Sequence, residues 1–115
     1  MKAALYRRYG GADVVEYADI VRPVPGAGEV LVKVAGTSFN PVDSGIRGGY
    51  LTDAFPISFP HVPGIDVAGT VAEVGVAVTA WKAGDTVVGL LPMTAPGAAA
   101  EYVIAPADVL ASAPA

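Results

Sequence analysis

Cysteine is absent from this 115-residue chain, and histidine occurs once, as His61. Without cysteine, the chain forms no disulfide and no thiolate metal site. Only 16% of the residues are charged, and 7 Lys and Arg stand against 11 Asp and Glu, for a net charge of −4. An acidic chain without a cluster of Lys and Arg is a poor match for nucleic acid, so no nucleic-acid partner is expected.

Long apolar runs are also missing. No stretch has the length of a membrane span, and Lys2, Arg7 and Arg8 interrupt any hydrophobic region of a signal peptide. We therefore expect a cytoplasmic protein without a membrane partner. The chain is instead rich in hydrophobic residues (53%), with 14 Gly and 10 Pro. This composition predicts one globular domain built from short elements and many turns.

Alternating apolar and β-branched residues predict a series of short strands. The clearest is VLVKVAG, residues 30–36. The other expected strands are Ala3–Tyr9, Val14–Val21, Ile65–Val74, Thr86–Leu90 and Ala99–Ile104. Turns are expected at Gly10-Gly11 and Trp81–Asp85, and irregular loops at Pro23–Glu29 and Tyr50–Pro63. The pattern predicts a mainly β domain, barrel or sandwich-like, and lacks the strand–helix alternation of a doubly wound fold.

One short helix is predicted from Pro41 to Arg47. Asn40 is a good N-cap before a proline at the first helical position, and Gly48-Gly49 ends the helix. Asp43 and Arg47 are four residues apart, a spacing that allows an ion pair. We expect a structural, helix-orienting role for both.

Three glycines in PGIDVAGTVAEVG, residues 63–75, raise the question of a phosphate-binding loop. A dinucleotide loop needs G-x-G-x-x-G between a strand and a helix. Here Gly64, Gly69 and Gly75 are spaced too widely, a strand pattern follows Gly69, and Gly-Lys-Ser/Thr occurs nowhere. We therefore expect these glycines to bend a strand or to let another backbone pack closely.

Five segments together resemble a known family: MKAALYRRYGG, PGAGEVLVKVAGTSFNPVDSGIRGGY, PGIDVAGTVAEVG, WKAGDTVVGL and GAAAEYVIAPADVLASAP. In this order they are similar to the N-terminal, GroES-like catalytic domain of the medium-chain dehydrogenase/reductase superfamily, in its zinc-independent quinone oxidoreductase branch, which includes zeta-crystallin. The resemblance implies a GroES-like, partly open barrel, incomplete relative to the family domain. Residues 1–115 would be the substrate-side domain, with the Rossmann nucleotide-binding domain outside this chain.

The resemblance also implies an activity. The parent enzyme would transfer a hydride from NADPH, held mainly by the other domain, to a quinone or an activated alkene, and this chain alone would be inactive. One alternative is an enoyl or alkenal reductase of the same superfamily. Another is a stand-alone GroES-like interaction module without redox activity, with the loop Tyr50–Pro63 as its contact.

The expected missing strands bear on assembly. By resemblance, strands from the far C-terminal end complete this domain, so its sheet edges would be open here. We therefore expect self-association or a homodimer, through an edge flanking Ala99–Ile104, or else a marginally folded chain.

The resemblance places candidate site residues as well. Asn40 falls where the zinc-dependent branch has its cysteine ligand, and Ile65 and Asp66 fall where it has a His-Glu pair. An amide and an isoleucine do not make a zinc site, so no metal is expected. His61, the lone histidine in a proline-rich loop, is expected to be a surface residue.

Without a metal, hydrogen-bond donors would polarise the substrate oxygen. The candidate catalytic residues are Asn40, through its amide, and Tyr50, through its phenol. By resemblance both face the nicotinamide and the substrate, while Asn40 also serves as the N-cap. The alternative for Tyr50 is a half-buried aromatic beside the glycine turn. Asp43, Arg47 and Asp66 would support the site, Asp66 by holding the bent strand.

Overall fold

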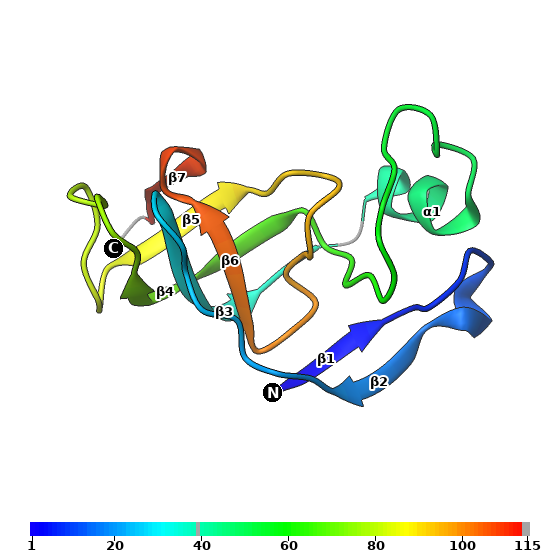
Figure 1. The fold of residues 1–115 in the computed structure, drawn as a ribbon, viewed down its shortest axis with the longest axis horizontal. Helices are drawn as coiled ribbons and strands as arrows, with labels where there is room; N and C mark the ends of the chain where they lie inside the picture. The colour runs from blue at the N-terminus through cyan, green and yellow to red at the C-terminus, as the bar shows by residue number, and fades with distance from the viewer. Residues whose placement is uncertain (39, 114–115) are drawn as a thin grey trace.

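The structure, a computed structural model, describes residues 1–38 and 40–113. These residues form two antiparallel sheets and one helix, α1 (Pro41–Gly48) (Figure 1). The smaller sheet pairs β1 (Lys2–Leu5) with β2 (Glu16–Asp19). The larger sheet has the spatial order β6-β3-β4-β5-β7. Its strands are β3 (Glu29–Gly36), β4 (Asp66–Val74), β5 (Thr86–Leu90), β6 (Tyr102–Pro106) and β7 (Leu110–Ser112).

The core of the larger sheet follows from strand alternation. Successive side chains of a strand point to opposite faces, and along β4 buried residues alternate with partly exposed ones. The buried residues of this core include Val30, Val32, Val67, Val71 and Val87. A second, smaller cluster joins the β1–β2 sheet to the loop before β4, through Ala3, Leu5 and Val62. The predicted mainly β fold with one short helix is confirmed.

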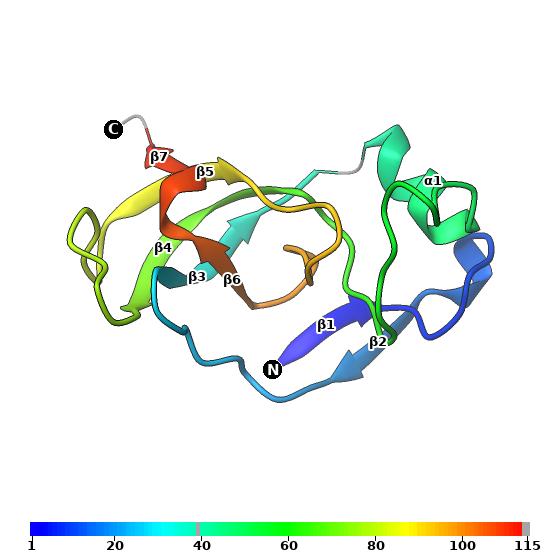
Figure 2. The same ribbon diagram turned by 45° about the horizontal axis from the view of Figure 1, so that its top comes forward.

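The larger sheet stays open. Its edge strands are β6 and β7, which lie at opposite ends of the strand order, so the sheet does not close into a barrel (Figure 2). The expected edge near Ala99–Ile104 is therefore an edge of the sheet. Two 3-10 turns link strands that are consecutive in the chain: Ala12–Val14 joins β1 to β2, and Ala107–Val109 joins β6 to β7. Within the described residues, no helix has the length and apolar character needed to cross a membrane.

Several predicted boundaries were wrong, and the reason is pairing between distant segments. The first strand ends at Leu5 rather than Tyr9, because Tyr6 pairs with His61 instead of with β2. The strand expected at Ala99–Ile104 starts later, at Tyr102, because Ala99 accepts the N–H of Ala4 at 2.8 Å. The three-residue strand β7 was missed, since so short an apolar run carries little signal.

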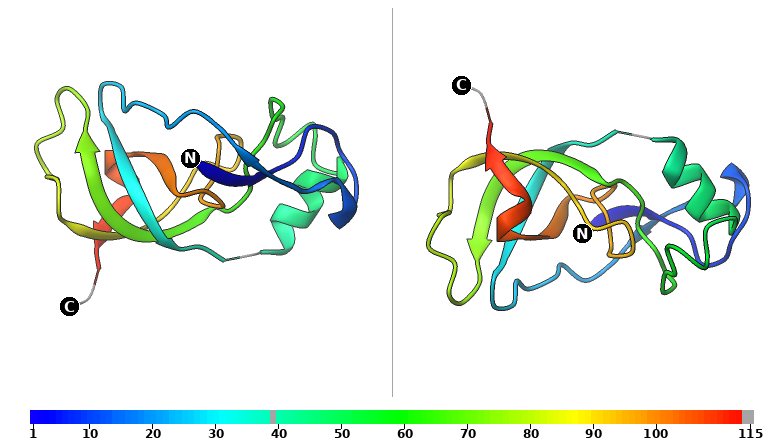
Figure 3. Two further views of the ribbon diagram at one scale, coloured as in Figure 1. Left: turned by 90° about the horizontal axis from the view of Figure 1, so that it is seen from below. Right: turned by 90° about the horizontal axis from the view of Figure 1, so that it is seen from above.

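The helix and the loop after it lie at one end of the molecule, beside the connection between β1 and β2 (Figure 3). The Gly10 N–H donates to the Arg47 carbonyl at 2.8 Å, which joins that connection to the end of α1. The far end of the larger sheet lies at the opposite end of the 39 Å long molecule.

An apolar cavity of about 450 Å³ separates the segment after β2 from β6. Its walls include Ile20, Val21, Val62, Tyr102 and Ile104, with Pro92 and Pro96 from the segment after β5. Arg22 stands near it, with its guanidinium 4.1 Å from the centre of the Tyr102 ring. None of the candidate catalytic residues lines this cavity.

Candidate functional site

The site begins at the start of α1, where the predicted cap is confirmed. Asn40 has an extended backbone and Pro41 follows at the first helical position. Asp43, at the third helical position, accepts the Asn40 backbone N–H at 3.0 Å through its carboxylate, in the arrangement of a capping box. Gly49 ends the helix in the left-handed conformation, which glycine adopts without a steric penalty.

The side chain of Asn40 reaches a different segment. Its amide nitrogen donates to the carboxylate of Asp66, the first residue of β4, at 2.8 Å. The Ser38 hydroxyl donates to the same carboxylate oxygen. The Thr37 hydroxyl donates to the Asp66 backbone carbonyl at 2.7 Å. Two predicted site residues, 26 positions apart, are therefore in direct contact.

We call these four residues, Thr37, Ser38, Asn40 and Asp66, the polar group of the site. Sequence reasoning missed Thr37 and Ser38, although two hydroxyl residues within three positions of the N-cap Asn40 were a usable signal. The hydrogen bond from Ser38, and then the one from Asn40, lower the pKa of the Asp66 carboxyl. Asp66 is therefore ionised at neutral pH and accepts hydrogen bonds without donating any.

Asp43 connects the helix to the strand that carries Asp66. It is only 4% exposed, and its second carboxylate oxygen accepts the N–H of Gly64 at 3.3 Å. Gly64 has φ +101°, and a Cβ there would come within 2.8 Å of the Thr37 hydroxyl. One buried carboxylate thus holds both the residue before α1 and the turn that leads into β4. The predicted supporting role of Asp43 fits this position.

Arg47, at the other end of α1, lies close to Tyr6, the residue that follows β1. Burial raises the pKa of the Tyr6 hydroxyl, and the positive charge of Arg47 opposes part of that rise. The Asp43 carboxylate accepts the two backbone N–H groups described above. The ion pair between Asp43 and Arg47 stays a prediction.

Tyr50 stands apart from the polar group. It is 85% exposed, so the alternative that sequence analysis left open for it, a half-buried ring beside the glycine turn, was wrong. The ring lies over Gly48, where a Cβ would come within 2.5 Å of it, and its backbone N–H donates to Gly45 at 3.1 Å. In the described part of the chain, no hydrogen bond joins the Tyr50 hydroxyl to Asn40 or Asp66.

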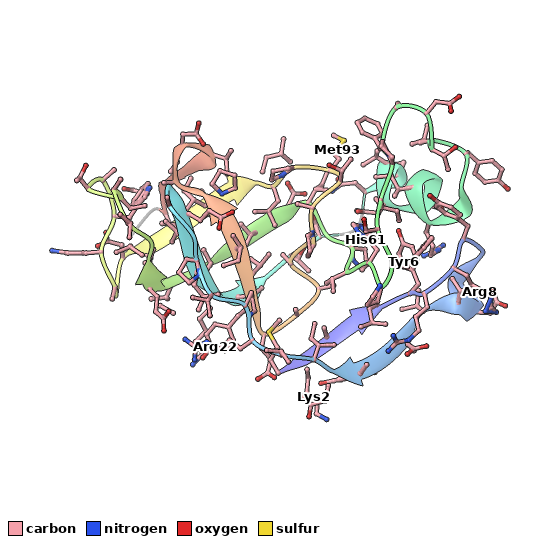
Figure 4. The ribbon with its side chains drawn as sticks, in the orientation of Figure 1. Lys2, Tyr6, Arg8, Arg22, His61 and Met93 are labelled. Atoms are coloured by element: carbon pink, nitrogen blue, oxygen red, sulfur yellow. The ribbon has the colours of Figure 1, made fainter. Side chains whose placement is uncertain are left out.

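The prediction that His61 is a surface residue was also wrong. His61 is 5% exposed and pairs with Tyr6 through backbone hydrogen bonds of 2.9 and 3.0 Å. The two rings pack edge to face with centroids 5.4 Å apart, and Figure 4 shows them side by side between β1 and α1. Burial lowers the pKa of His61, and the Asp43 carboxylate opposes part of that change. Burial also raises the pKa of Tyr6 to about 12.

The glycines of residues 63–75 have the packing role that was predicted. A Cβ on Gly69 would lie 2.2 Å from the Lys33 carbonyl oxygen of β3, and one on Gly75 would lie 1.8 Å from the Gly26 carbonyl oxygen. The space beside these two glycines is filled by the chain's own backbone. They therefore do not fit the pyrophosphate of a dinucleotide.

The residues of the site are not arranged as metal ligands. Among residues 1–38 and 40–113, no three His, Asp or Glu side chains gather in a way that would hold a metal ion. Around the polar group, the donors are an amide and two hydroxyls, and the one carboxylate already accepts from two of them. The arrangement suits hydrogen-bond donation to a small polar atom.

Comparison with known families agrees with this fold. The alcohol dehydrogenase GroES-like domain family matches residues 26–115. The chain belongs to this family, and its similarity to quinone oxidoreductases over nearly its whole length confirms the resemblance to that branch.

Three similar proteins illustrate the match. The chain is 38% identical to a chloroplastic quinone-oxidoreductase homolog of Spinacia oleracea, over 99% of this chain and 35% of that protein. It is 46% identical to a chloroplastic NADPH-dependent alkenal/one oxidoreductase of Arabidopsis thaliana, over 76% of this chain and 22% of that protein. A mycobacterial protein solved in complex with NADPH superposes with a TM-score of 0.86 at 37% identity, over 99% of this chain and 34% of that chain. The chain thus spans about a third of the length of its quinone oxidoreductase relatives.

Proposed function

We propose that this chain is the substrate-side domain of a zinc-independent, NADPH-dependent oxidoreductase that reduces a quinone or an activated alkene by hydride transfer. The observation that carries the proposal is the contact between Asn40 and Asp66. By resemblance, these residues occupy positions where zinc-dependent relatives hold their metal. Here the Asn40 amide donates to the Asp66 carboxylate, on a fold similar to quinone oxidoreductases.

The proposed role of this group is to polarise the substrate oxygen. One N–H of the Asn40 amide is taken by Asp66, and a primary amide has two. The second N–H would donate to the oxygen on which negative charge develops, as an oxyanion-hole donor does. Tyr50, exposed beside the end of α1, would supply a second donor through its hydroxyl. Asn40 would also contact the nicotinamide side of the cofactor.

The cofactor supplies the hydride when it is bound. Because the glycines of residues 63–75 do not fit a pyrophosphate, we place NADPH binding mainly in a separate nucleotide-binding domain of the parent protein. This chain would shape the substrate side of the cleft. Isolated residues 1–115 should then bind NADPH only weakly, and calorimetric titration giving micromolar affinity would overturn this division of labour.

The alkenal reductase alternative is kept because of one observation. The identity to the Arabidopsis thaliana alkenal/one oxidoreductase, 46% over 88 residues, is higher than the 38% to the spinach homolog. Both reactions place negative charge on an oxygen conjugated with the reduced carbon, so the same donor group would serve either.

Substrate assays on the complete gene product that contains this chain would test the proposal. NADPH oxidation would be followed with 1,4-benzoquinone, with an α,β-unsaturated aldehyde and with the matching saturated aldehyde. We expect turnover with one of the first two substrates and none with the third. Turnover with the saturated aldehyde alone would contradict the proposed function. So would the absence of NADPH oxidation with all three substrates.

Zinc content gives an independent test. Because the site offers amide and hydroxyl donors around a single carboxylate, chelator-washed protein should contain far less than one zinc per chain by elemental analysis. One zinc per chain, retained after washing, would remove the zinc-independent part of the proposal.

A further inference from the structure

The Asn40 amide is held in one orientation by its surroundings. Its own backbone is fixed by the Asp43 carboxylate at 3.0 Å and by Pro41, which follows it. Its side chain meets the Asp66 carboxylate at 2.8 Å. A contact to the Ser38 hydroxyl at 3.5 Å is at the limit of a hydrogen bond and holds the amide weakly.

A primary amide can be turned over with little change in shape, which exchanges its NH2 group and its oxygen. The partner decides which orientation is favoured. An ionised carboxylate accepts hydrogen bonds only, so it binds the NH2 group and repels the amide oxygen. The Ser38 hydroxyl donates to the same Asp66 oxygen and keeps that carboxyl ionised.

Asp66 is itself well anchored. It is the first residue of β4 and pairs with Leu90 of β5. Its backbone carbonyl accepts the Thr37 hydroxyl at 2.7 Å. The carboxylate therefore has a fixed position relative to both α1 and the sheet, and a group bonded to it inherits that position.

We propose that Asp66 is a positioning residue, whose carboxylate fixes the orientation of the Asn40 amide so that its second N–H is the one presented to a substrate oxygen. The inference deepens the proposed function and depends on it for the substrate. The orienting contact itself does not depend on catalysis. If Asp66 only held β4 in place, the effect of its substitution on turnover would not depend on the presence of Asn40.

The contact can be tested by spectroscopy, because Asn40 is the only asparagine of the chain and glutamine is absent. A nitrogen–proton correlation spectrum therefore contains one carboxamide signal pair. We expect its two protons to be well separated in the wild type, since one is bonded to a carboxylate. Asp66→Ala, which removes the carboxylate and adds no carboxamide of its own, should bring them toward the values of a free amide.

The matched control is Asp85→Ala, which removes a carboxylate that accepts the Lys82 N–H at 2.9 Å in a turn away from the site and likewise adds no carboxamide. It should leave the carboxamide pair unchanged. Asp66→Glu, which keeps the charge but moves it, provides a second variant if Asp66→Ala does not fold. A carboxamide pair unaffected by both Asp66 variants would overturn the inference whatever the enzyme does.

Kinetics of the complete gene product test the rest. Asp66→Asn should lower kcat between about 10- and 100-fold in the wild-type background, as misplacement of a catalytic group does. In an Asn40→Ala background it should lower kcat less than about twofold, since residues acting as a unit are not additive. Equal losses in both backgrounds would overturn the inference and leave the proposed function intact. An inactive wild type would instead overturn the proposed function, and the carboxamide spectrum would still decide the orienting contact.

Discussion

Asn40 takes part in two hydrogen-bond systems at once. Its backbone N–H belongs to the capping box of α1, and its side chain belongs to the polar group with Asp66. Capping alone explains an asparagine at this position. The contact with Asp66 is additional, because a cap needs no carboxylate 26 residues away. The two systems can be separated by substitution.

Asn40→Ala should lower turnover of the complete gene product by one to three orders of magnitude, about the worth of one oxyanion donor. It should also cost about 1 kcal/mol of stability through loss of the cap. Asn40→Ser is the matched control, since serine caps helices well but lacks the amide. Wild-type turnover in Asn40→Ser would show that capping, rather than amide donation, is what the position requires.

Tyr50→Phe removes one hydroxyl and keeps the ring. Because the side chain is 85% exposed, the free energy of unfolding should change by less than about 0.5 kcal/mol. If the phenol donates to substrate in the parent enzyme, kcat should fall by one to three orders of magnitude with KM changed much less. Unchanged kcat would limit Tyr50 to covering the end of α1.

Because of His61, we expect the protein to become less stable as the pH falls below neutral. Its pKa is lowered in the fold by burial, whereas in the unfolded chain it has the ordinary value near 6.5. Below about pH 6.5 the unfolded chain takes up a proton that the fold excludes. The free energy of unfolding should therefore fall with pH, by at most about 1.4 kcal/mol per pH unit, until the pH passes the folded pKa.

Urea unfolding from about pH 7.5 to 5.5 would measure this slope above the range where free carboxylates titrate. His61 is the only histidine, so His61→Phe, which keeps a ring against Tyr6, should flatten the slope. If the variant shows the same pH dependence of unfolding, titratable groups other than His61 cause it.

Among the elements, the pairing of β3 with β4 decides the geometry of the site. Its register shifts between Val34 and Gly36, just before the segment that carries Asn40. Gly69 lies opposite Val34, where its missing side chain lets the β3 backbone come close. The bend then delivers Thr37 and Ser38 to the start of β4. A packing requirement in the sheet thus shapes the polar group.

Gly69→Ala should be strongly destabilising. Its Cβ would be 2.2 Å from the Lys33 carbonyl oxygen, a backbone atom that moves only with the whole strand. We expect a loss of about 3 kcal/mol or more in the free energy of unfolding. Gly36→Ala is the matched control, because a Cβ there meets nothing within 4 Å. Equal effects in thermal or urea unfolding would mean that the close approach at Gly69 relaxes freely.

At the scale of the whole molecule, the open edges of the larger sheet are the main feature that favours contact between copies of the chain. Its edge strand β6 lies beside the apolar cavity of about 450 Å³, and Ile104 belongs to both. Several large apolar side chains are exposed, among them Val21, at 90%, on the wall of this cavity. Only 16% of the residues are charged, so little opposes contact between copies.

We therefore expect the isolated chain to self-associate through β6. Sedimentation at several concentrations should show mass increasing with concentration. Ile104→Lys, which places a charge on the edge strand, should reduce the association, while Val76→Lys, in an exposed turn away from β6, should not. A monodisperse, cooperatively melting wild-type monomer would show that the open edges are tolerated.

The sequence by itself determined the local features. Thr86–Leu90 was predicted at its observed bounds, and the helix from Pro41 differs only in its last residue, because propensity, capping and turn chemistry are properties of neighbouring residues. The packing role of Gly69 was one of the two roles predicted from the missing phosphate-loop fingerprint, the other being a bend in the strand. Asn40 and Asp66 were predicted as site residues through resemblance, without their contact.

Only the tertiary structure decided which segments meet. Tyr6 and His61 are 55 positions apart along the chain, and their pairing shortens the first strand and buries the histidine. The exposure of Tyr50 and the contact of Asn40 with Asp66 are likewise set by how α1 docks against the start of β4. Burial, and with it the pKa of a side chain, depends on partners brought from elsewhere in the chain, and local sequence carries no record of them.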